Sequence, residues 1–381
     1  MKNNRTFLEK LLEGSEVEWK PLDEVANIVN NARKPVKSSL RVSGNIPYYG
    51  ANNIQDYVEG YTHEGEFVLI AEDGSASLEN YSIQWAVGKF WANNHVHVVN
   101  GKEKLNNRFL YHYLTNMNFI PFLAGKERAK LTKAKLQQIP IPIPPLSVQT
   151  EIVKILDALT ALTSELTSEL TSELILRQKQ YEYYREKLLN IDEMNKVIEL
   201  GDVGPVRMCK RILKNQTASS GDIPFYKIGT FGKKPDAYIS NELFQEYKQK
   251  YSYPKKGDIL ISASGTIGRT VIFDGENSYF QDSNIVWIDN DETLVLNKYL
   301  YHFYKIAKWG IAEGGTIQRL YNDNLKKVKI SIPPLKEQHR IVSILDKFET
   351  LTNSITEGLP LAIEQSQKRY EYYRELLLNF S

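Results

Sequence analysis

Two histidines in the sequence are spaced so that they could hold a metal ion together. His95 and His97 are two residues apart, which places both side chains on one face of a β-strand, and imidazole nitrogen is a common zinc ligand. No cysteine or carboxylate cluster accompanies them, and the single cysteine, Cys209, lies in no reactive-thiol context. We therefore expect no metal site and no thiol chemistry in this chain.

A second pattern superficially resembles the metal-binding core of some nucleases. Asp236 follows a proline and precedes Glu246, which stands two residues before Lys248, as in a PD…ExK arrangement. So short a pattern arises easily in a lysine-rich chain. The sequence also has no G-x-x-x-x-G-K-[ST] nucleotide loop and no Asn/Asp-Pro-Pro-aromatic signature of amino-methyltransferases. We expect a chain without a catalytic site, and a nuclease built on these three residues is an alternative.

Polar loops supply side chains that suit the bases and phosphates of DNA. They mix glycine, serine and threonine with basic or amide residues, at 71–77, 93–95, 125–135, 262–269 and 313–323. Arginine and lysine suit guanine edges and phosphates, whereas asparagine and glutamine suit adenine edges. Taken alone, such loops are ordinary turns and solvated faces; their place in two similar domains favours DNA binding. The residues predicted to bind DNA are Tyr48, Asn52, Ser75, Asn93, Asn94, Lys126, Arg128, Lys130, Lys133, Tyr226, Lys227, Ser264, Thr266, Arg269, Thr316, Gln318 and Arg319.

Short apolar runs between these loops predict the strands and helices that position them. The runs have the length and composition of strands: FVLIA (67–71), NHVHVV (94–99), DILIS (258–262) and NIVWI (284–288). NRFLYHYL (107–114) and NKYLYHFY (297–304) predict one helix beside each set. This mixture predicts two compact α/β domains.

The chain is an internal duplication. IPPLSVQTEIVKILD begins at Ile143 and returns as IPPLKEQHRIVSILD at Ile332, and YEYYREKLLN ends at Asn190 and returns as YEYYRELLLN ending at Asn379. Both pairs are separated by 189 residues, and about half of the aligned positions are identical without a gap. Upstream the likeness is weaker. Each half is thus a divergent front followed by a matched tail, so we expect the fronts to bind different things and the tails to share a scaffold or partner role.

The start of the chain repeats part of a tail as well. FLEKLL (7–12) resembles REKLLN (185–190), which leads into the second front. A chain that begins with the end of a tail resembles a circularly permuted arrangement of fronts and tails. The N- and C-terminal ends are therefore expected to pack together.

Each tail predicts a long helix. A Pro-Pro pair, which cannot lie inside a helix, comes first, and apolar residues then follow helical spacing. Helix 147–190 would be roughly 65 Å long at ~1.5 Å per residue, whereas EGLP (357–360) should break the second helix. The TSEL repeats of the first tail predict one winding leucine stripe that packs on the second tail as an antiparallel pair. Its leucines are Leu162, Leu166, Leu170 and Leu174.

The YEYYRE segment of each tail has two interpretations. Tyrosine suits packing between helices and also contact with another subunit. We expect interhelix packing first and keep partner binding as the alternative. The residues predicted to bind a partner are Tyr181, Tyr183, Tyr184, Arg185, Tyr370, Tyr372, Tyr373 and Arg374.

The charge of the chain is uneven. The net charge is only +2, but residues 201–330 contain 19 Lys/Arg and 14 Asp/Glu, whereas residues 146–200 contain 6 and 10. Phosphate attraction needs a local basic face rather than a basic whole, so DNA is not excluded. With 42% hydrophobic residues, one cysteine, and no stretch apolar enough for a signal peptide or a membrane span, a soluble cytoplasmic protein is expected.

The sequence resembles the specificity (S) subunit of type I restriction–modification enzymes over nearly its whole length. The resemblance rests on the order front–tail–front–tail and on two motifs that begin and end each tail. These are PPL-x-x-Q-x-x-IV-x-ILD (Pro144 to Asp157, Pro333 to Asp346) and Q-K-x-YEYYRE-x-LLN (Gln178 to Asn190, Gln367 to Asn379). The TSEL units resemble the short spacer repeats of some members. One departure is Thr171, which stands where the second tail has Pro360, so the first helix is expected to run on where the second is interrupted.

The resemblance implies an α+β fold. Two pseudo-symmetric α/β target-recognition domains (1–145 and 197–334) would be separated by two long, antiparallel, coiled-coil-like helical spacers (146–196 and 335–381). Each domain would read one half of a split, asymmetric site in double-stranded DNA. The spacers would dock two methyltransferase (modification) subunits for adenine methylation, with restriction (motor–nuclease) subunits completing the enzyme. S-adenosylmethionine, ATP and Mg²⁺ would belong to those partners, with no cofactor in this chain. A stand-alone two-domain DNA-binding protein is the other alternative.

The tetrapeptide repeat leads to a first prediction. Each TSEL unit adds about 6 Å of helix and about 40° of rotation, close to two base pairs at ~3.4 Å each. Our hypothesis is that the number of repeats sets the number of unread bases between the half-sites. Deleting one unit should shorten that gap and leave both half-sites unchanged in genome-wide methylation maps; an unchanged gap would rule out this role.

Overall fold

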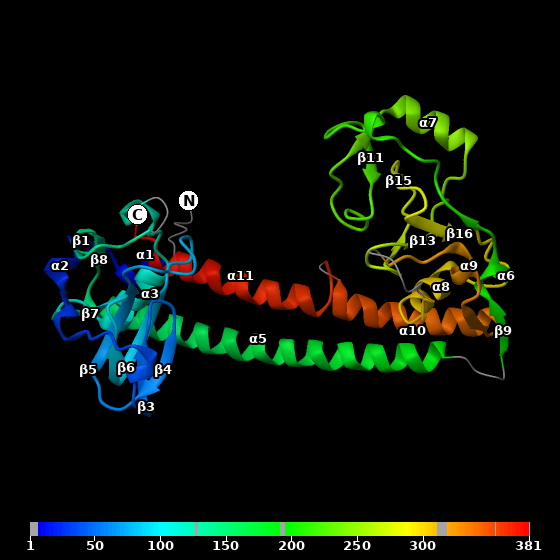
Figure 1. The fold of residues 1–381 in the computed structure, drawn as a ribbon. Coiled ribbons are helices and arrows are strands. Elements are labelled where there is room, and N and C mark those ends of the chain that lie inside the picture. The colour runs from blue at the N-terminus through cyan, green and yellow to red at the C-terminus, as the bar shows by residue number, and fades with distance from the viewer. Residues whose placement is uncertain (1–6, 126–128, 191–194, 311–317, 355, 381) are drawn as a thin grey trace, which may run out of the picture. The chain divides into compact units, whose positions relative to one another are not determined.

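The computed structural model describes residues 7–125, 129–190, 195–310, 318–354 and 356–380. The chain forms two compact units: unit 1 contains Met1–Glu169 and Ile363–Ser381, and unit 2 contains Leu170–Ala362 (Figure 1). Each unit therefore combines one front of the duplication with parts of both tails. Among the described helices, none has both the length and the apolar composition that a membrane span requires.

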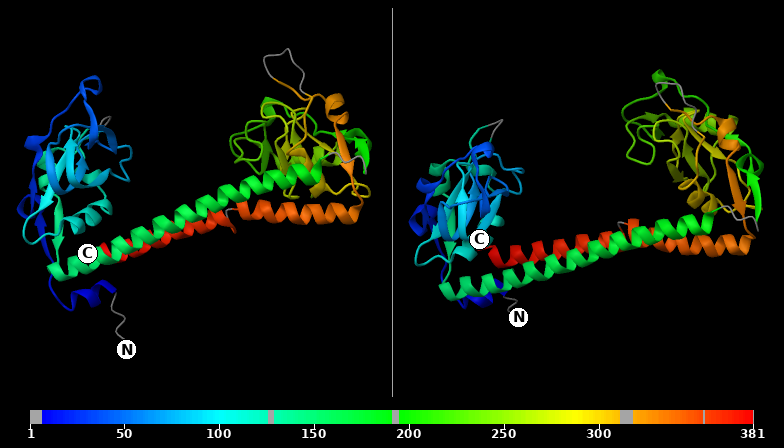
Figure 2. Two further views of the ribbon diagram at one scale, coloured as in Figure 1. Left: turned by 90° about the horizontal axis from the view of Figure 1, so that it is seen from below. Right: turned by 60° about the horizontal axis from the view of Figure 1, so that its bottom comes forward.

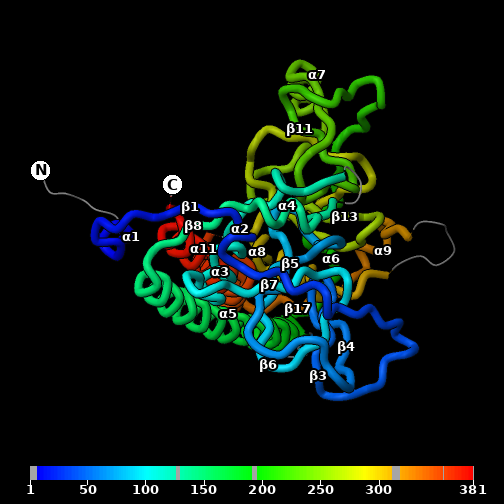
Figure 3. The backbone as a smooth tube through the Cα atoms, turned by 90° about the vertical axis from the view of Figure 1, so that its left-hand side faces the viewer, coloured from blue at the N-terminus to red at the C-terminus, as the bar shows by residue number. Residues whose placement is uncertain are grey.

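Unit 1 is built on a six-stranded sheet in the order β2-β7-β5-β6-β3-β4. All neighbours are antiparallel except β3 and β6, which run parallel. Figure 3 faces this unit, with β5, β6 and β7 together and β3 and β4 at one edge. The bounds are β2 Ala26–Ile28, β3 Ser43–Tyr49, β4 Ile54–Val58, β5 His63–Ala71, β6 Ile83–Ala92 and β7 Val96–Gly101; a separate pair joins β1 Glu18–Pro21 to β8 Pro140–Ile143.

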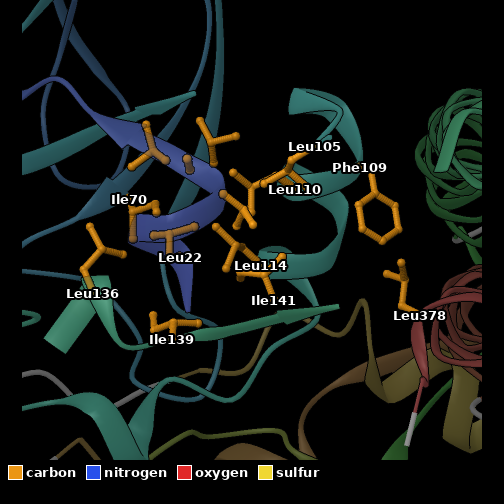
Figure 4. Packing of buried hydrophobic residues seen from close by; sticks show 14 of the residues in the cluster. Leu22, Ile70, Leu105, Phe109, Leu110, Leu114, Leu136, Ile139, Ile141 and Leu378 are labelled. Atoms are coloured by element: carbon orange, nitrogen blue, oxygen red, sulfur yellow. The ribbon is translucent and has the colours of Figure 1, made fainter. Parts of the chain in front are cut away.

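Helix α3 (Asn107–Thr115) packs its apolar face on this sheet. Phe109, Leu110 and Leu114 are fully buried and belong to the same core as Ile70 of β5, and Figure 4 shows them with Leu378 of the C-terminal helix close by. The side chain of Asn106 caps α3 by accepting hydrogen bonds from two backbone N–H groups of its first turn. The predicted strands and the predicted helix of the first front are confirmed.

Unit 2 repeats this plan with its main sheet split in two. In unit 1 the long strand β6 pairs with both β5 and β3. In unit 2 the two pairings belong to separate strands, since β14 pairs with β13 and β15 pairs with β11. The sheets have the orders β10-β16-β13-β14, β12-β11-β15 and β17-β9. The bounds are β9 Lys196–Glu199, β10 Val206–Arg207, β11 Ile223–Tyr226, β12 Tyr238–Ile239, β13 Ile259–Ser262, β14 Thr270–Ile272, β15 Tyr279–Phe280, β16 Ile285–Ile288 and β17 Lys329–Ile332.

Unit 2 also contains a helix, α7 (Asn241–Lys250), which follows β12. Helix α8 (Asn297–Tyr304) corresponds to α3 and buries Tyr299, Leu300 and Phe303. The remaining short helices are α1 Phe7–Leu12, α2 Leu22–Val25, α4 Lys133–Gln137, α6 Leu200–Val203, α9 Asn322–Lys326 and the 3₁₀ turns Asn30–Ala32, Ser38–Leu40, Ile120–Phe122 and Lys214–Gln216.

The tails are the long helices. The first is one continuous helix, α5 (Leu146–Leu189), and the second is divided into α10 (Leu335–Asn353) and α11 (Leu359–Leu378), as Figures 1 and 2 show. The predicted break at EGLP is confirmed. Gly358 there has φ +107, and a Cβ would lie 2.6 Å from the Thr350 carbonyl oxygen, so the helix ends in a backbone turn that favours glycine.

The predicted leucine stripe is wrong in part. Leu162 and Leu166 are 62% and 39% exposed, whereas Thr163 and Thr167 are half-buried. A step of four residues turns a helix by about 400°, so each leucine lies about 40° further round and the series cannot keep facing one neighbour. In unit 1 the hydroxyls of Thr160 in α5 and Tyr370 in α11 form a 3.0 Å hydrogen bond, so threonine and tyrosine take part in this helix contact.

The expected packing of the two chain ends is confirmed within unit 1. Leu8 of α1 is buried in the same core as Leu377 and Leu378 of α11. The Phe380 ring meets Phe109 of α3 edge-on, with centroids 6.0 Å apart. The FLEKLL segment, which resembles the end of the first tail, therefore forms a helix beside the end of the second tail.

A buried glutamine fastens each front to its long helix. Gln149, fully buried in α5, accepts a hydrogen bond from the Asn106 backbone N–H and donates to the carbonyls of Lys104 and Pro144 at 2.8–2.9 Å. Gln338 in α10 repeats all three bonds, accepting from the Leu296 N–H and donating to the Leu294 and Pro333 carbonyls. This is the glutamine of the repeated PPL-x-x-Q motif.

A histidine–aspartate pair adds a second tie at each joint. His112 Nε2 donates to Asp157 Oδ1 at 2.7 Å in unit 1. His302 Nε2 donates to Asp346 Oδ1 at 2.8 Å in unit 2. Both histidines are buried while their aspartate partners are partly exposed, and each bond links α3 or α8 to its long helix.

Replacing Gln149 with alanine should destabilise unit 1. The change leaves one N–H and two carbonyls without their partner, at about 1–3 kcal/mol for each group that water cannot reach, and the bond to the Pro144 carbonyl is buried. We expect the free energy of unfolding to fall by at least ~2 kcal/mol in denaturant titrations, with faster hydrogen exchange in α3. Gln178→Ala, on the exposed face of α5, is the control; equal stability of the two variants would contradict this role.

Candidate nucleic-acid interface

Three loops meet in each unit through the same backbone hydrogen bonds. We define loop cluster 1 as the segments 72–77, 93–95 and 129–133 with the adjoining residues Arg33, Asn52 and His97, and loop cluster 2 as the segments 263–269, 281–284 and 318–320 with the adjoining residues Tyr226 and Lys227. In cluster 1 the Glu72 N–H donates to the His95 carbonyl, and the Leu131 N–H donates to the Glu72 carbonyl. In cluster 2, Ala263, Asn284 and Leu320 take these places, with distances of 2.7 and 2.8 Å.

The same frame includes one isolated β-bridge in each unit. Asp73 pairs with Lys130 in cluster 1, and Ser264 pairs with Arg319 in cluster 2. The first loop of each cluster directly follows the central strand β5 or β13, whose buried residues fix where the loop starts. Two different sets of side chains are thus presented on one backbone arrangement.

Cluster 1 contains a compensated group of charges. One carboxylate oxygen of Glu72 accepts a hydrogen bond from Arg33 Nη1 at 2.7 Å, and the other forms a salt bridge with Lys130 Nζ at 2.9 Å. Arg33 also donates to the Val96 carbonyl. Burial alone would raise the pKa of Glu72, but the hydrogen bonds from the two cations outweigh it and lower that pKa. Lys130, predicted to bind DNA, is therefore held by a carboxylate.

The two histidines of cluster 1 have different environments. His97 is fully buried and uses both ring nitrogens: Nε2 donates to the Leu131 carbonyl at 2.7 Å, and Nδ1 accepts from the Asn30 amide at 2.9 Å. Burial lowers the pKa of His97, so the neutral ring of these hydrogen bonds is favoured. His95 is half exposed and lies 2.5 Å from Asp73 Oδ1. The two rings therefore have different partners, and both ring nitrogens of His97 already take part in hydrogen bonds.

Burial corrects the prediction of direct DNA contact for three residues. Tyr48 is 1% exposed, its hydroxyl accepts from the Val36 N–H, and its ring stacks on Trp91. Asn93 is 3% exposed and caps the His95 N–H. Ser264, 7% exposed, donates to Asn284 Oδ1 at 2.8 Å. Such groups shape the loops from inside.

Two other predicted residues of cluster 1 are accessible but hold the loops together. Asn52 donates to the Gly74 carbonyl and accepts from the Ala76 N–H, both at 2.8 Å. Ser75 donates to the Ser77 carbonyl. Asn94 and Lys133 are exposed. Lys126 and Arg128 lie outside the described residues.

Cluster 2 presents arginines that are paired with carbonyls. Arg269 donates to the Phe231 carbonyl at 3.1 Å and lies 3.5 Å from the Thr266 hydroxyl. Arg319 donates to the Ser283 carbonyl at 3.3 Å. Within the described ranges neither guanidinium has a carboxylate partner. The positive charge of cluster 2 is therefore less compensated than that of cluster 1.

The other residues of unit 2 that were predicted to bind DNA have different surroundings. Tyr226 stacks on Phe280 with ring centroids 5.8 Å apart, and the backbone at Tyr226 accepts from the Gln281 N–H. Lys227 pairs with Asp236 at 2.8 Å. Gln318 is exposed, and Thr316 lies outside the described residues.

Sequence reasoning missed four residues of cluster 1: Arg33, Glu72, Asp73 and His95. The strand order brings them together, because β7 lies between β2 and β5 in the sheet. The loops predicted at 71–77 and 93–95 contain Glu72, Asp73 and His95, although none of the three was singled out as a DNA contact, and Arg33 had no signal in the sequence.

The YEYYRE residues divide between packing and exposure. Tyr181 is 5% exposed and stacks on Phe348 of α10, with centroids 6.2 Å apart, as expected for interhelix packing. Arg374 donates to the Asn116 side chain at 3.0 Å. The exposed members are Tyr183, Tyr184, Tyr372 and Tyr373, while Arg185 and Tyr370 are half-buried.

One group of metal-ligand type occurs in the described part of the chain. His302, Asp346 and Glu349 bring ligand atoms within 4.8 Å of one another. Lys305 lies on Glu349 at 2.5 Å and Lys298 on Asp346 at 3.4 Å, so ammonium groups already balance these carboxylates. In the nuclease-like pattern, Glu246 pairs with Lys250, and Lys248 lies over the rings of Phe244 and Tyr253.

Mild acid should destabilise the protein through its buried histidines. Burial lowers the pKa of His97, His112 and His302 below 6.5, so the unfolded chain binds protons that the folded chain excludes. The stability contributed by the neutral rings is complete above pH 6.5 and is lost as pH falls through the lowered values. His97→Gln should reduce this slope by up to ~1.4 kcal/mol per pH unit, measured by denaturant titration. The exposed His339→Gln is the control, and equal slopes would contradict the expectation.

Comparisons with known proteins agree with this arrangement. Residues 14–175 and 192–365 match the model of the type I restriction modification DNA specificity domain. The chain is 99% identical over 385 residues to a putative type I restriction enzyme specificity subunit of Haemophilus influenzae, with both chains fully covered. It is 32% identical to the EcoR124I/EcoR124II specificity subunit of Escherichia coli, covering 98% of this chain and 97% of the relative.

Solved structures show the same fold. A structure described as concerning complex assembly and conformational transition of a type I restriction–modification system superposes with a TM-score of 0.62 at 15% identity, covering 96% of this chain and 98% of that chain. The HsdS subunit from Thermoanaerobacter tengcongensis gives 0.55 at 16% identity, covering 97% and 98%. Two matched domains that together span most of the sequence show that the chain belongs to the family of type I restriction–modification DNA specificity proteins.

Proposed function

We propose that this chain is the DNA-recognition subunit of a type I restriction–modification complex and that each loop cluster reads one half of a split, asymmetric DNA site. The observation that carries the proposal is the shared frame: the same backbone bonds support different side chains in the two units. A duplicated frame with divergent loops suits a protein that must read two different base sequences.

The proposed contacts divide by chemistry. Arg269, Arg319 and the exposed Gln318 of cluster 2 offer donors for guanine edges, adenine edges and phosphates. In cluster 1 the exposed Asn94 and Lys133 offer similar groups. Buried members of both clusters contribute by holding the loops in place, which keeps the readers in a defined geometry.

The partners in this proposal are two methyltransferase subunits and, in the full enzyme, restriction subunits. The exposed tyrosines Tyr183, Tyr184, Tyr372 and Tyr373 give each tail an aromatic surface, which is common in protein interfaces. S-adenosylmethionine, ATP and Mg²⁺ belong to the partners in this scheme, because the catalytic steps take place there. The repeated sequence of the two tails supports two equivalent docking sites.

The spacer hypothesis remains part of the proposal. The alignment with the Haemophilus relative spans 385 positions, four more than the 381 residues of this chain. Four residues are the length of one TSEL unit. That relative is therefore a natural comparison for the length of the gap between half-sites.

Replacing Arg319 with alanine tests the proposal. If cluster 2 reads DNA, the loss of one guanidinium should weaken preference at one base position of one half-site by about 1–3 kcal/mol, which is roughly 5- to 150-fold. The other half-site should stay unchanged in methylation maps made with the co-expressed methyltransferase. Lys368→Ala, on the exposed face of α11, is the control. Equal maps for the Arg319 variant and wild type would contradict a reading role.

A further inference from the structure

We propose that Asp73, held in place by His95, accepts a hydrogen bond from the amino group of one base in the half-site of unit 1. The inference rests on the proposed function and deepens it, because it names residues and a base chemistry for cluster 1. It also makes the two half-sites chemically different: cluster 1 presents acceptors where cluster 2 presents guanidinium donors.

The pair is the accessible part of the charge network in cluster 1. The side chains of Asp73 and His95 are 37% and 49% exposed, whereas those of Glu72 and Arg33 are 15% and 17% exposed. Glu72 is committed to two cations, Arg33 and Lys130. The inner carboxylate therefore holds the cluster together, and the outer one is placed where a ligand can reach it.

Both members of the pair are held in place by the frame. Asp73 lies in the β-bridge to Lys130. The His95 carbonyl accepts from Glu72, and the His95 N–H donates to the Asn93 side chain at 2.8 Å. A reader fixed in this way loses little conformational freedom when it binds.

The chemistry of the pair follows from its hydrogen bond. A carboxylate can only accept, so His95 Nδ1 carries the proton and donates to Asp73 Oδ1 over 2.5 Å. His95 therefore holds the carboxylate in place, and Asp73 Oδ2 offers an acceptor to a ligand. In a base pair, cytosine N4 and adenine N6 each keep one N–H free for the major groove, which a carboxylate oxygen can accept, whereas guanine O6 and N7 would be repelled.

The equivalent position of unit 2 supports this assignment. The shared frame places Ser264 where cluster 1 has Asp73, and Asn284 where it has His95. Ser264 and Asn284 also join the two loops by a side-chain hydrogen bond, at 2.8 Å. A side-chain hydrogen bond between these two loops is thus present in both units. In cluster 2 it joins two neutral side chains, and the serine is only 7% exposed. Of these two clusters, only cluster 1 has a charged and exposed pair.

The test uses the full chain assembled with its methyltransferase subunits. Asp73→Asn keeps the shape of the side chain and turns one acceptor into a donor. Methylation mapping should show relaxed or altered preference at one base position of one half-site, by roughly 5- to 150-fold. The other half-site and the gap should stay the same. Glu59→Gln is the control, because it removes one carboxylate from the same unit. Glu59 lies next to the end of β4 at which Val58 pairs with Ser43, whereas Tyr49 and the loops lie at the other end. This variant should leave the map unchanged.

Three results would overturn the inference. The first is an unchanged methylation map for Asp73→Asn, and the second is a change in both half-sites. The third is a loss of binding by Asp73→Asn that is equal for all four base pairs, whichever position of the duplex is varied. The last measurement uses the purified complex and decides the case if methylation is lost altogether. A different result would contradict the proposed function itself: the wild-type complex would methylate no split site that depends on this chain.

Discussion

The buried glutamine at the start of each long helix is the interaction on which the rest of the structure depends. Gln149 and Gln338 each complete three backbone hydrogen bonds that join a front domain to its helix. The bonds to the Pro144 and Pro333 carbonyls are buried, so an apolar group in place of either amide would leave these carbonyls unpaired. Because the joint is the same in both units, each front can change without altering how it is held.

The loops are the part of each front that differs between the two units. The frame of two backbone hydrogen bonds and a β-bridge is present in both clusters, yet the side chains that it supports differ in charge and burial. Cluster 1 balances Glu72 against Arg33 and Lys130, whereas Arg269 and Arg319 of cluster 2 are bonded to carbonyls. Constancy of the backbone and variation of the side chains suit a protein whose halves have to recognise different targets.

Sequence reasoning predicted the elements whose signals are local or repeated. The duplication predicted two domains with two tails, and glycine with proline at EGLP predicted the interruption between α10 and α11. The repeated LL-containing segments predicted that α1 would join the C-terminal helix. All three depend on residue types and spacing that a single sequence displays directly.

The parts that sequence reasoning missed depend on neighbours across the sheet. Glu72 meets Arg33 because β2 and β5 both flank β7, a strand order that no local pattern reveals. Tyr48 looked like an accessible reader but lies beneath Trp91 and Arg41. The leucines of the TSEL units wind round α5, so an even apolar spacing did not produce an evenly buried face.

The central claim is that each front domain is an independent reader on a constant support. Its most direct test exchanges residues 1–145 for the corresponding domain of the Escherichia coli relative and maps the sites methylated by the assembled complex. The account predicts that one half-site changes while the other half-site keeps its sequence. A hybrid that folds and assembles but changes both half-sites, or neither, would contradict it.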